Sequence, residues 1–305
     1  MGQRHRGGIV VAPLVGAVLL LTGCPQGERS APATSTAAPT TSGVAPATPA
    51  VPTTSAAASA PASGRSSAPT PERSRAPADF VALPDVDPTI VTDARYATAH
   101  NFVGRPIAGY REPLCLLTRP AAEALRRVQE AARATGHRLK VYDCYRPQRA
   151  VDEFVAWGRD ADDDRMKAEF YPDVAKSRLF ADGYLGAPTA HSRGSTVDLT
   201  LVADPPPEQP RYAPGERLVP CTAPAGRRFA DNGVDMGTGF DCFDPRAHTA
   251  APGITGLARA NRDLLKRLMT AHGFTNYPRE WWHYRYDDEP YPETYFDFPV
   301  ARSSL

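Results

Sequence analysis

The fold is organised by the stretch AHSRGSTVDLTL at residues 190–201. Its second half alternates apolar and polar side chains, which is typical of a β-strand, and its first half contains a glycine that indicates a turn. The alternation places Asp198 opposite Val197 and Leu199, where a charge is costly unless it is paired. The turn brings His191 back toward Asp198, so that an imidazole and a carboxylate converge as in a divalent metal site. The alternative is a His–Asp hydrogen bond that only fastens the turn.

A second stretch, EWWHYRY at residues 280–286, supplies another histidine and another carboxylate. We interpret it as an aromatic strand. Together with His191 and Asp198, His283 would give a metal three protein ligands and one open position, as in catalytic rather than structural zinc sites. Glu280 would then accept a proton from the attacking water as general base. The alternative is an aromatic core strand with a buried histidine.

Two more charged residues stand at places where sites form. Arg146 follows a predicted strand at residues 139–143 and precedes a proline. A fixed positive charge at a strand end would stabilise a developing oxyanion, and a plain surface charge is the alternative. Asp241 follows the glycine-containing residues 236–239 and would receive a substrate ammonium. A turn-stabilising aspartate is the alternative there.

The other segments predict a mixed fold. Pro120 and Gly136 bracket a helix with one apolar stripe, and further helices are expected over residues 151–157 and 257–269. Because few strands are interspersed with these helices, the sequence predicts an α+β fold with a small, mainly antiparallel sheet and flanking helices. Residues 203–239 are rich in Pro, Gly and charge without periodicity, and we interpret them as a surface insertion.

The N-terminus has the features of an export signal. Basic residues precede an apolar run at residues 8–21 that is too short for an ordinary transmembrane helix. Cys24 follows Leu-Thr-Gly, which resembles the lipobox of bacterial lipoproteins, where the cysteine is lipidated after cleavage. We therefore expect a signal peptide at residues 1–23 and a lipid anchor on the outer face of the bacterial cytoplasmic membrane. The alternative is a plain signal peptide with an incidental cysteine.

Composition divides the rest of the chain and excludes one class of partner. Residues 24–78 consist mostly of Pro, Ala, Ser and Thr. Such a segment cannot bury enough apolar area to offset the entropy of ordering it, so we interpret it as a disordered tether. The folded domain is expected at residues 79–305. With 35 basic and 34 acidic residues and no nucleic-acid-binding motif, the chain is expected to bind no nucleic acid.

Cysteine usage fits an exported domain. Apart from Cys24, the cysteines are Cys115, Cys144, Cys221 and Cys242. An even number favours two disulfides, for which three pairings are possible. Proximity in the sequence favours the pairs Cys115–Cys144 and Cys221–Cys242. A cysteine-rich zinc site is the alternative, and the absence of a C-x-x-C pair argues against it.

Several motifs, in the same order along residues 93–298, carry a resemblance to a known family. They are DARYAT at 93–98, YRP at 145–147, HSRGSTVDLTL at 191–201, FD at 240–241, EWWHY at 280–284, and DEPYP and YFDFP near the C-terminus. The folded part resembles the VanX-like D-alanyl-D-alanine dipeptidases, within the wider superfamily of zinc D-Ala-D-Ala carboxypeptidases and hedgehog-type domains. The resemblance implies the zinc fold of that superfamily and one zinc ion per chain.

The resemblance also implies roles for individual residues. It places zinc on His191, Asp198 and His283. It makes Glu280 the general base and Arg146 the group that stabilises the tetrahedral intermediate. It assigns the substrate amino group to Asp241, the pocket wall to Tyr96 and the substrate carboxylate to Thr189, where relatives can carry a serine.

The implied activity is hydrolysis of D-Ala-D-Ala to two D-Ala, outside the membrane and in the turnover of cell-wall peptides. One alternative is a D,D-carboxypeptidase acting on peptidoglycan stem peptides, and another is a non-catalytic wall-binding lipoprotein. Two departures from the family pattern accompany the export signal. Cys144 stands where the family commonly has glycine, which suggests a disulfide close to Arg146. The insertion at residues 203–239 is expected to alter access to the pocket.

Overall fold

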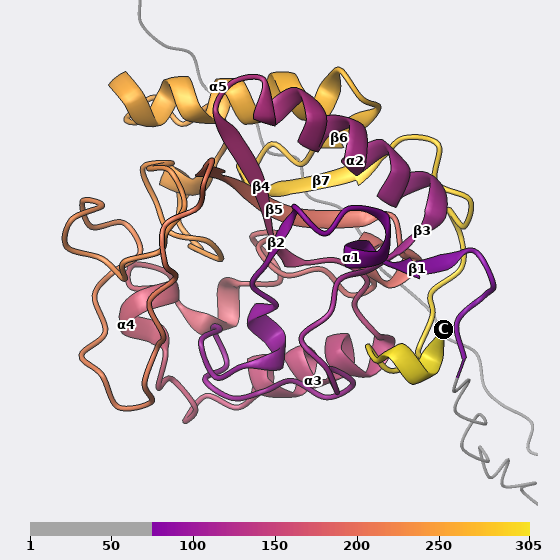
Figure 1. Cartoon of the computed structure of the whole chain (residues 1–305). Coiled ribbons are helices and arrows are strands. Elements are labelled where there is room, and N and C mark those ends of the chain that lie inside the picture. Colours follow the sequence, from indigo (N-terminus) through magenta and orange to yellow (C-terminus); the bar gives the residue numbers. More distant parts are fainter. Residues whose placement is uncertain (1–74) are drawn as a thin grey trace, which may run out of the picture. The chain divides into compact units, whose positions relative to one another are not determined.

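The computed structural model describes residues 75–305 (Figure 1). The predicted signal peptide, Cys24 and the predicted tether up to residue 74 lie outside the described residues. Within residues 75–305, no helix combines the length and the apolar character needed to cross a membrane.

A five-stranded sheet forms the centre of the fold. Its strands, in spatial order, are β2 (Val91–Thr92), β4 (His137–Asp143), β5 (Thr196–Ala203), β7 (His283–Tyr286) and β6 (Phe274–Asn276). In this sheet the β2–β4 pair is parallel and the other three pairs are antiparallel. A separate antiparallel pair joins β1 (Phe80–Ala82), which runs into the single turn α1 (Leu83–Val86), to β3 (Leu116–Thr118). The predicted α+β class with a small, mainly antiparallel sheet is confirmed.

Two long helices, α2 (Arg119–Arg133) and α5 (Gly256–Thr270), cover one face of the sheet (Figure 1). The α2 helix begins with a proline in its first turn and buries Leu125 and Val128 against the sheet. After the helix, Gly136 adopts a φ of 76°, a left-handed conformation that glycine takes with little strain. Both helices lie where the sequence predicts them.

The other side of the sheet carries α3 (Gln148–Arg159), α4 (Lys167–Phe170) and long loops (Figure 1). They enclose a second, aromatic core whose larger members are Tyr96, Phe102, Phe154, Trp157, Phe170, Phe243 and Phe298. The helix predicted over residues 151–157 lies inside α3. The described chain therefore has a mainly aliphatic core, called the aliphatic core below, that includes the helix-covered face, and an aromatic core on the face where the strands present polar side chains.

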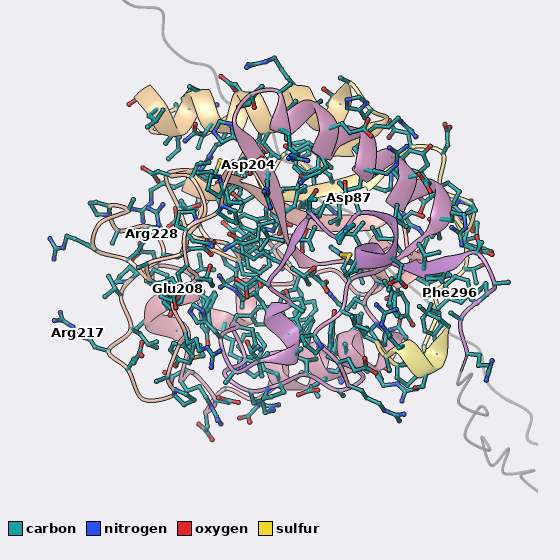
Figure 2. The ribbon with its side chains drawn as sticks, in the orientation of Figure 1. Asp87, Asp204, Glu208, Arg217, Arg228 and Phe296 are labelled. Carbon is teal, nitrogen blue, oxygen red and sulfur yellow. A yellow bond between two sulfur atoms is a disulfide. The ribbon has the colours of Figure 1, made fainter. Side chains whose placement is uncertain are left out.

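Two disulfides join Cys115 to Cys144 and Cys221 to Cys242, as sequence proximity favours. The first links the chain before β3 to the end of β4. The second links Cys221, within residues 203–239, to Cys242 just after them. Residues 203–239, named the insertion below, contain neither helix nor strand after Ala203. Figure 2 shows Glu208, Arg217 and Arg228 of the insertion together on one side of the molecule.

The aromatic strand expected at residues 280–286 is shorter than the sequence predicts. The strand β7 begins only at His283, and the preceding residues form a turn. The reason is local, because the Glu280 N–H donates to the carbonyl of Tyr277 (3.0 Å) and closes a turn that contains Pro278. Glu280 is thereby presented from a turn rather than from a strand.

Candidate metal centre and substrate pocket

The strand register brings three polar side chains into one row across the sheet. Asp143 at the end of β4 lies opposite Asp198 of β5, and Asp198 lies opposite His283 of β7. Val197 and Leu199, the neighbours of Asp198, belong to the aliphatic core. Because side chains alternate along a strand, Asp198 points to the opposite face. The row therefore forms on the side of the sheet that faces the aromatic core.

His191 reaches this row from the turn before β5. A short 3-10 helix at Ala190–Arg193 ends at Gly194, whose φ is 83° and whose position leaves no room for a Cβ beside the Phe80 ring. Nδ1 of His191 lies 2.7 Å from the carbonyl oxygen of Cys144. That oxygen only accepts, so Nδ1 carries the proton and Nε2 presents its lone pair to the row.

The predicted metal ligands meet at one point. Nε2 of His191 lies 3.2 Å from Nδ1 of His283 and 3.4 Å from Oδ2 of Asp198. The distance from Nδ1 of His283 to Oδ1 of Asp198 is 3.1 Å. A tetrahedral zinc ion with bonds of about 2.0–2.1 Å has ligand atoms about 3.3 Å apart, which fits these separations. Oδ1 of Asp198 is also buried without a hydrogen-bond partner in the described part of the chain, as expected of an atom that faces a cation.

Glu280 lies beside these ligands. Its Oε2 is 3.6 Å from Nδ1 of His283, and its side chain is buried. Burial, reinforced by the charges of Asp198 and Asp241, raises the pKa of Glu280 well above its ordinary value. The side-chain amide of Asn276 donates to the Glu280 carbonyl (2.9 Å) and holds the turn. A carboxyl group with a raised pKa is suited to exchange protons near neutral pH.

Arg146 is buried, which excludes the interpretation as a surface charge. Its Nε donates to Oδ2 of Asp143 (3.0 Å), and its Nη2 forms an ion pair with the same oxygen (2.9 Å). The hydroxyl of Tyr110 donates to the other oxygen of Asp143 (2.6 Å), and the ring of Tyr96 lies 5.0 Å from the guanidinium carbon. Nη2 is also 3.6 Å from Asp198. These contacts hold the guanidinium beside the metal ligands.

Asp143 and Tyr110 were not predicted from the sequence. Tyr110 is a single residue whose partner, Asp143, lies 33 residues further along the chain. The one available signal is that Asp143 is a carboxylate at the end of a strand, three residues before Arg146. A buried carboxylate at that place needs a cation, and Arg146 supplies it.

Asp241 and Tyr96 form a second polar pair. The Tyr96 hydroxyl donates to Oδ2 of Asp241 (2.8 Å), and both side chains are buried. Asp241 has a φ of 52° and is the one non-glycine residue with positive φ among residues 75–305. Such backbone strain persists only where surrounding contacts enforce it. Burial and the nearby charge of Asp198 raise the pKa of Asp241 to about 8.

One cavity of about 480 Å³ connects these groups. Its lining includes Tyr96, Arg146, Thr189, His191, Asp198, Asp241, Glu280 and His283. Oγ1 of Thr189 accepts the backbone N–H of His191 (3.4 Å), and the loop at residues 183–188 forms part of the wall. No residue of the insertion lines the cavity, so the expectation that the insertion alters access is wrong for this cavity.

Two histidines and an aspartate around one point, with a buried carboxyl group and a guanidinium in the same cavity, define a metal-dependent peptidase. Sequence comparison identifies which one. The chain belongs to peptidase family M15, described as D-Ala-D-Ala dipeptidase, whose profile matches residues 76–207 and 209–301. The family inferred from the motifs is confirmed.

Individual relatives cover most of the described chain. The D-alanyl-D-alanine dipeptidase of Streptomyces coelicolor is 40% identical over 223 residues, which are 73% of this chain and 98% of that protein. The enzyme of the same name from Enterococcus faecalis is 39% identical over 211 residues, 68% of this chain and 92% of that protein. That of Escherichia coli is 31% identical over 206 residues, 68% of this chain and 83% of that protein.

We predict that His191→Ala, Asp198→Ala or His283→Ala each removes the bound metal. The reason is that the two protein ligands that remain in each variant bind zinc too weakly to retain it. Metal analysis of dialysed protein should find about one zinc per wild-type chain and far less in each variant. His272→Ala, which changes a histidine outside this site, is the matched control and should keep its zinc. Full occupancy in all three variants would contradict the assignment.

Proposed function

We propose that the chain hydrolyses D-Ala-D-Ala, or a closely similar D,D-dipeptide, to free D-amino acids, with one zinc ion held by His191, Asp198 and His283. Membership of family M15 supports the activity. The observation that carries the choice of a dipeptide is the buried Asp241 in the same cavity as the metal ligands. A buried carboxylate pairs best with a cation, and the free ammonium of a dipeptide is such a cation.

The reaction divides among named groups. When bound, zinc supplies Lewis acidity that polarises the scissile carbonyl and lowers the pKa of water. Glu280 takes a proton from the attacking water and transfers it to the leaving amine nitrogen as the C–N bond breaks. Arg146 stabilises the negative charge that develops on the carbonyl oxygen. Asp241 and Tyr96 bind the ammonium, and Thr189 is proposed to bind the carboxylate.

We predict that Glu280→Gln keeps its zinc but loses about 10²–10⁴-fold in kcat, because the amide cannot accept the proton from water. Turnover and zinc content should be measured on the same preparation. Glu293→Gln changes an exposed carboxyl outside the cavity and should retain wild-type turnover. Near-normal turnover in zinc-loaded Glu280→Gln would assign the base to another residue.

We also propose that the enzyme is lipid-anchored through Cys24 on the outer face of the bacterial cytoplasmic membrane. The basic N-terminus, the apolar run at residues 8–21 and the cysteine after Leu-Thr-Gly support this location. An enzyme in that place meets dipeptide released from the wall rather than dipeptide on its way into cytoplasmic precursors. The proposed physiological role is therefore the turnover of cell-wall peptides.

We predict that Cys24→Ser releases the protein from the membrane fraction of expressing bacteria and abolishes labelling with radioactive palmitate, because the lipid is attached at that sulfur. Its dipeptidase turnover should equal that of the wild type, since the substitution leaves the cavity unchanged. A wild-type protein that is unlabelled and fractionates with cytoplasmic enzymes would contradict the proposed location.

Substrate length tests the proposed function most directly. Acetylation of the dipeptide removes the positive charge that Asp241 needs and adds bulk at its place. N-acetyl-D-Ala-D-Ala should therefore be cleaved at least about a hundredfold more slowly than D-Ala-D-Ala, measured as kcat/KM. Asp241→Asn should narrow that gap by slowing the free dipeptide more than the acetylated one. Equal cleavage of both substrates by the wild type would contradict the proposed dipeptidase activity and favour the D,D-carboxypeptidase alternative.

A further inference from the structure

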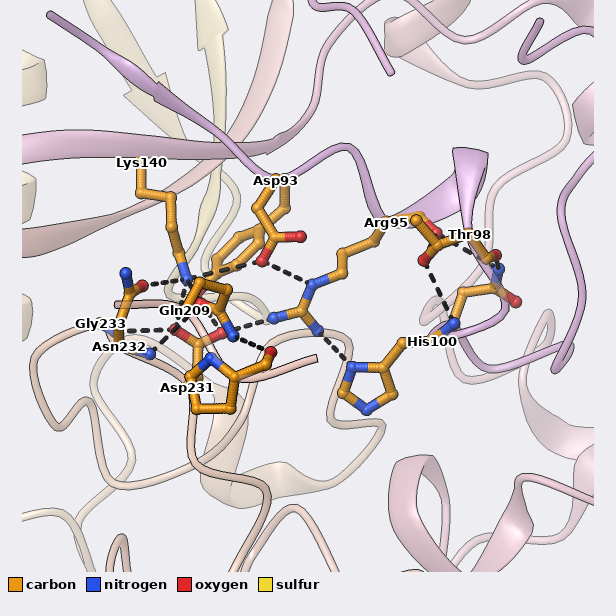
Figure 3. Close-up of polar contacts among 12 residues, drawn as sticks. Asp93, Arg95, Thr98, His100, Lys140, Gln209, Asp231, Asn232 and Gly233 are labelled. Carbon is orange, nitrogen blue, oxygen red and sulfur yellow. Dashed lines mark hydrogen bonds and ion pairs between the residues drawn. The ribbon is translucent and has the colours of Figure 1, made fainter. Parts of the chain in front are cut away.

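The carboxylate of Asp231 anchors the insertion to the sheet at a place where two buried cations meet. Figure 3 shows Asp231 between Lys140 and Arg95, each of which donates to one of its oxygens. The hydroxyl of Tyr142 donates to Oδ2 of Asp231 (3.0 Å). Lys140 and Tyr142 are two residues apart on β4 and project from the same face, so the insertion is tied to the sheet through that strand.

The two cations depend on this carboxylate because they are buried. The side chain of Lys140 is 0% exposed and that of Arg95 is 5% exposed. Gln209 and Asn232 add neutral oxygens to Lys140, both at 2.7 Å, and both belong to the insertion. Burial opposes the charge on Asp231, but Arg95 and Lys140 lower its pKa to about 2. Asp231 is therefore ionised at neutral pH and pairs with both cations.

Arg95 carries this anchor to the substrate pocket. It lies in the single 3-10 turn Arg95–Ala97, directly before Tyr96. The guanidinium is held between Asp93 (2.9 Å) and Asp231, which fixes the turn from which the Tyr96 side chain projects. The Tyr96 hydroxyl in turn donates to Asp241. Asp231 is thus connected to the proposed ammonium site at Asp241 through its ion pair with Arg95 and through Tyr96, the next residue.

A second path reaches the same pocket from the other side. Phe240, which precedes Asp241, stacks on the ring of Tyr142 with centroids 4.3 Å apart and planes at 16°. The Tyr142 hydroxyl is held by Asp231. The strained backbone of Asp241 is thus supported by the stacking of Phe240 on Tyr142, and Asp231 orients the Tyr142 ring.

We propose that Asp231 is a positioning residue through which the insertion holds Tyr96 and Asp241 in place to bind the substrate ammonium. The inference rests on the proposed function, because it assigns to the insertion the selection of dipeptides with a free amino group. Asp231 does not line the cavity and contacts neither the metal ligands nor Glu280. Its loss should therefore affect substrate binding and leave the metal and the proton transfer in place.

The test compares Asp231→Asn with the wild type on free and N-acetylated D-Ala-D-Ala. An interaction made equally in the ground and transition states changes KM and leaves kcat unchanged. Asp231→Asn should raise KM for the free dipeptide about tenfold or more, with kcat within about threefold and zinc content unchanged. The preference for the free over the acetylated dipeptide should fall by about the same factor. Asp204→Asn is the matched control. Asp204 also lies in the insertion and pairs with two arginines, Arg133 and Arg138, but it has no contact with Arg95.

A double variant separates positioning from stability. Asp231→Asn leaves the buried Lys140 with only the more distant carboxylate of Asp93 (3.5 Å) and is expected to unfold more easily. Lys140→Met combined with Asp231→Asn removes that poorly compensated charge and should recover stability in urea unfolding, while Arg95 still lacks its second carboxylate. KM should remain raised in the double variant. A double variant that recovers both stability and the wild-type KM would show that Asp231 is only structural.

The two proposals fail in different ways. A wild-type enzyme that cleaves both dipeptides equally contradicts the proposed function, and the inference with it. A wild-type enzyme that discriminates, beside an Asp231→Asn variant that keeps both the KM and the discrimination, contradicts the inference alone. If Asp231→Asn does not fold, the double variant and the Asp204→Asn control decide the question on the same measurements.

Discussion

Mutual repulsion among buried carboxylates is the constraint on which this site depends. Three of them, Asp198, Asp241 and Glu280, line the cavity, and a fourth, Asp143, pairs with Arg146 of the lining. Arg146 is the one Lys or Arg side chain among the residues that line it. Burial, with repulsion from neighbouring carboxylates, raises the pKa of all but Asp198, whose pKa is lowered by two histidines in spite of its burial. Because a nearby cation favours the ionised form of these carboxyl groups, the site is complementary to a divalent cation and to an ammonium group.

The sheet is what makes such a concentration of charge tolerable. Three antiparallel-paired strands hold Asp143, Asp198 and His283 in register, and the aliphatic core beneath them is packed against two helices. Each disulfide lies next to a residue that this arrangement must hold. Cys144 is two residues before Arg146, and Cys242 directly follows Asp241. One disulfide therefore constrains the chain beside Arg146, and the other constrains it beside Asp241.

Local patterns predicted the parts of this structure that local interactions determine. Alternation and a glycine were enough to predict the turn and strand at residues 190–201, and the helix after Pro120 followed from its apolar stripe. The strand at residues 280–286 was predicted too long, because a hydrogen-bonded turn at Glu280 competes with aromatic strand propensity. Asp231 was missed because it acts through partners distant in the sequence. A lone aspartate in an aperiodic stretch carries no local signal of the cations that it meets after folding.

The resulting architecture separates the chemistry from the choice of substrate. The candidate metal ligands come from the sheet and from a turn bonded to it, so their geometry is a property of the core. The groups proposed to bind the ammonium come from loops, and loops hold a strained, buried carboxylate only if something else fixes them. Arg95 and Tyr142 connect those loops to Asp231 of the insertion. On the proposed role of Asp231, a change in the insertion alters which peptide is bound and leaves the metal ligands and Glu280 in place, because Asp231 contacts neither.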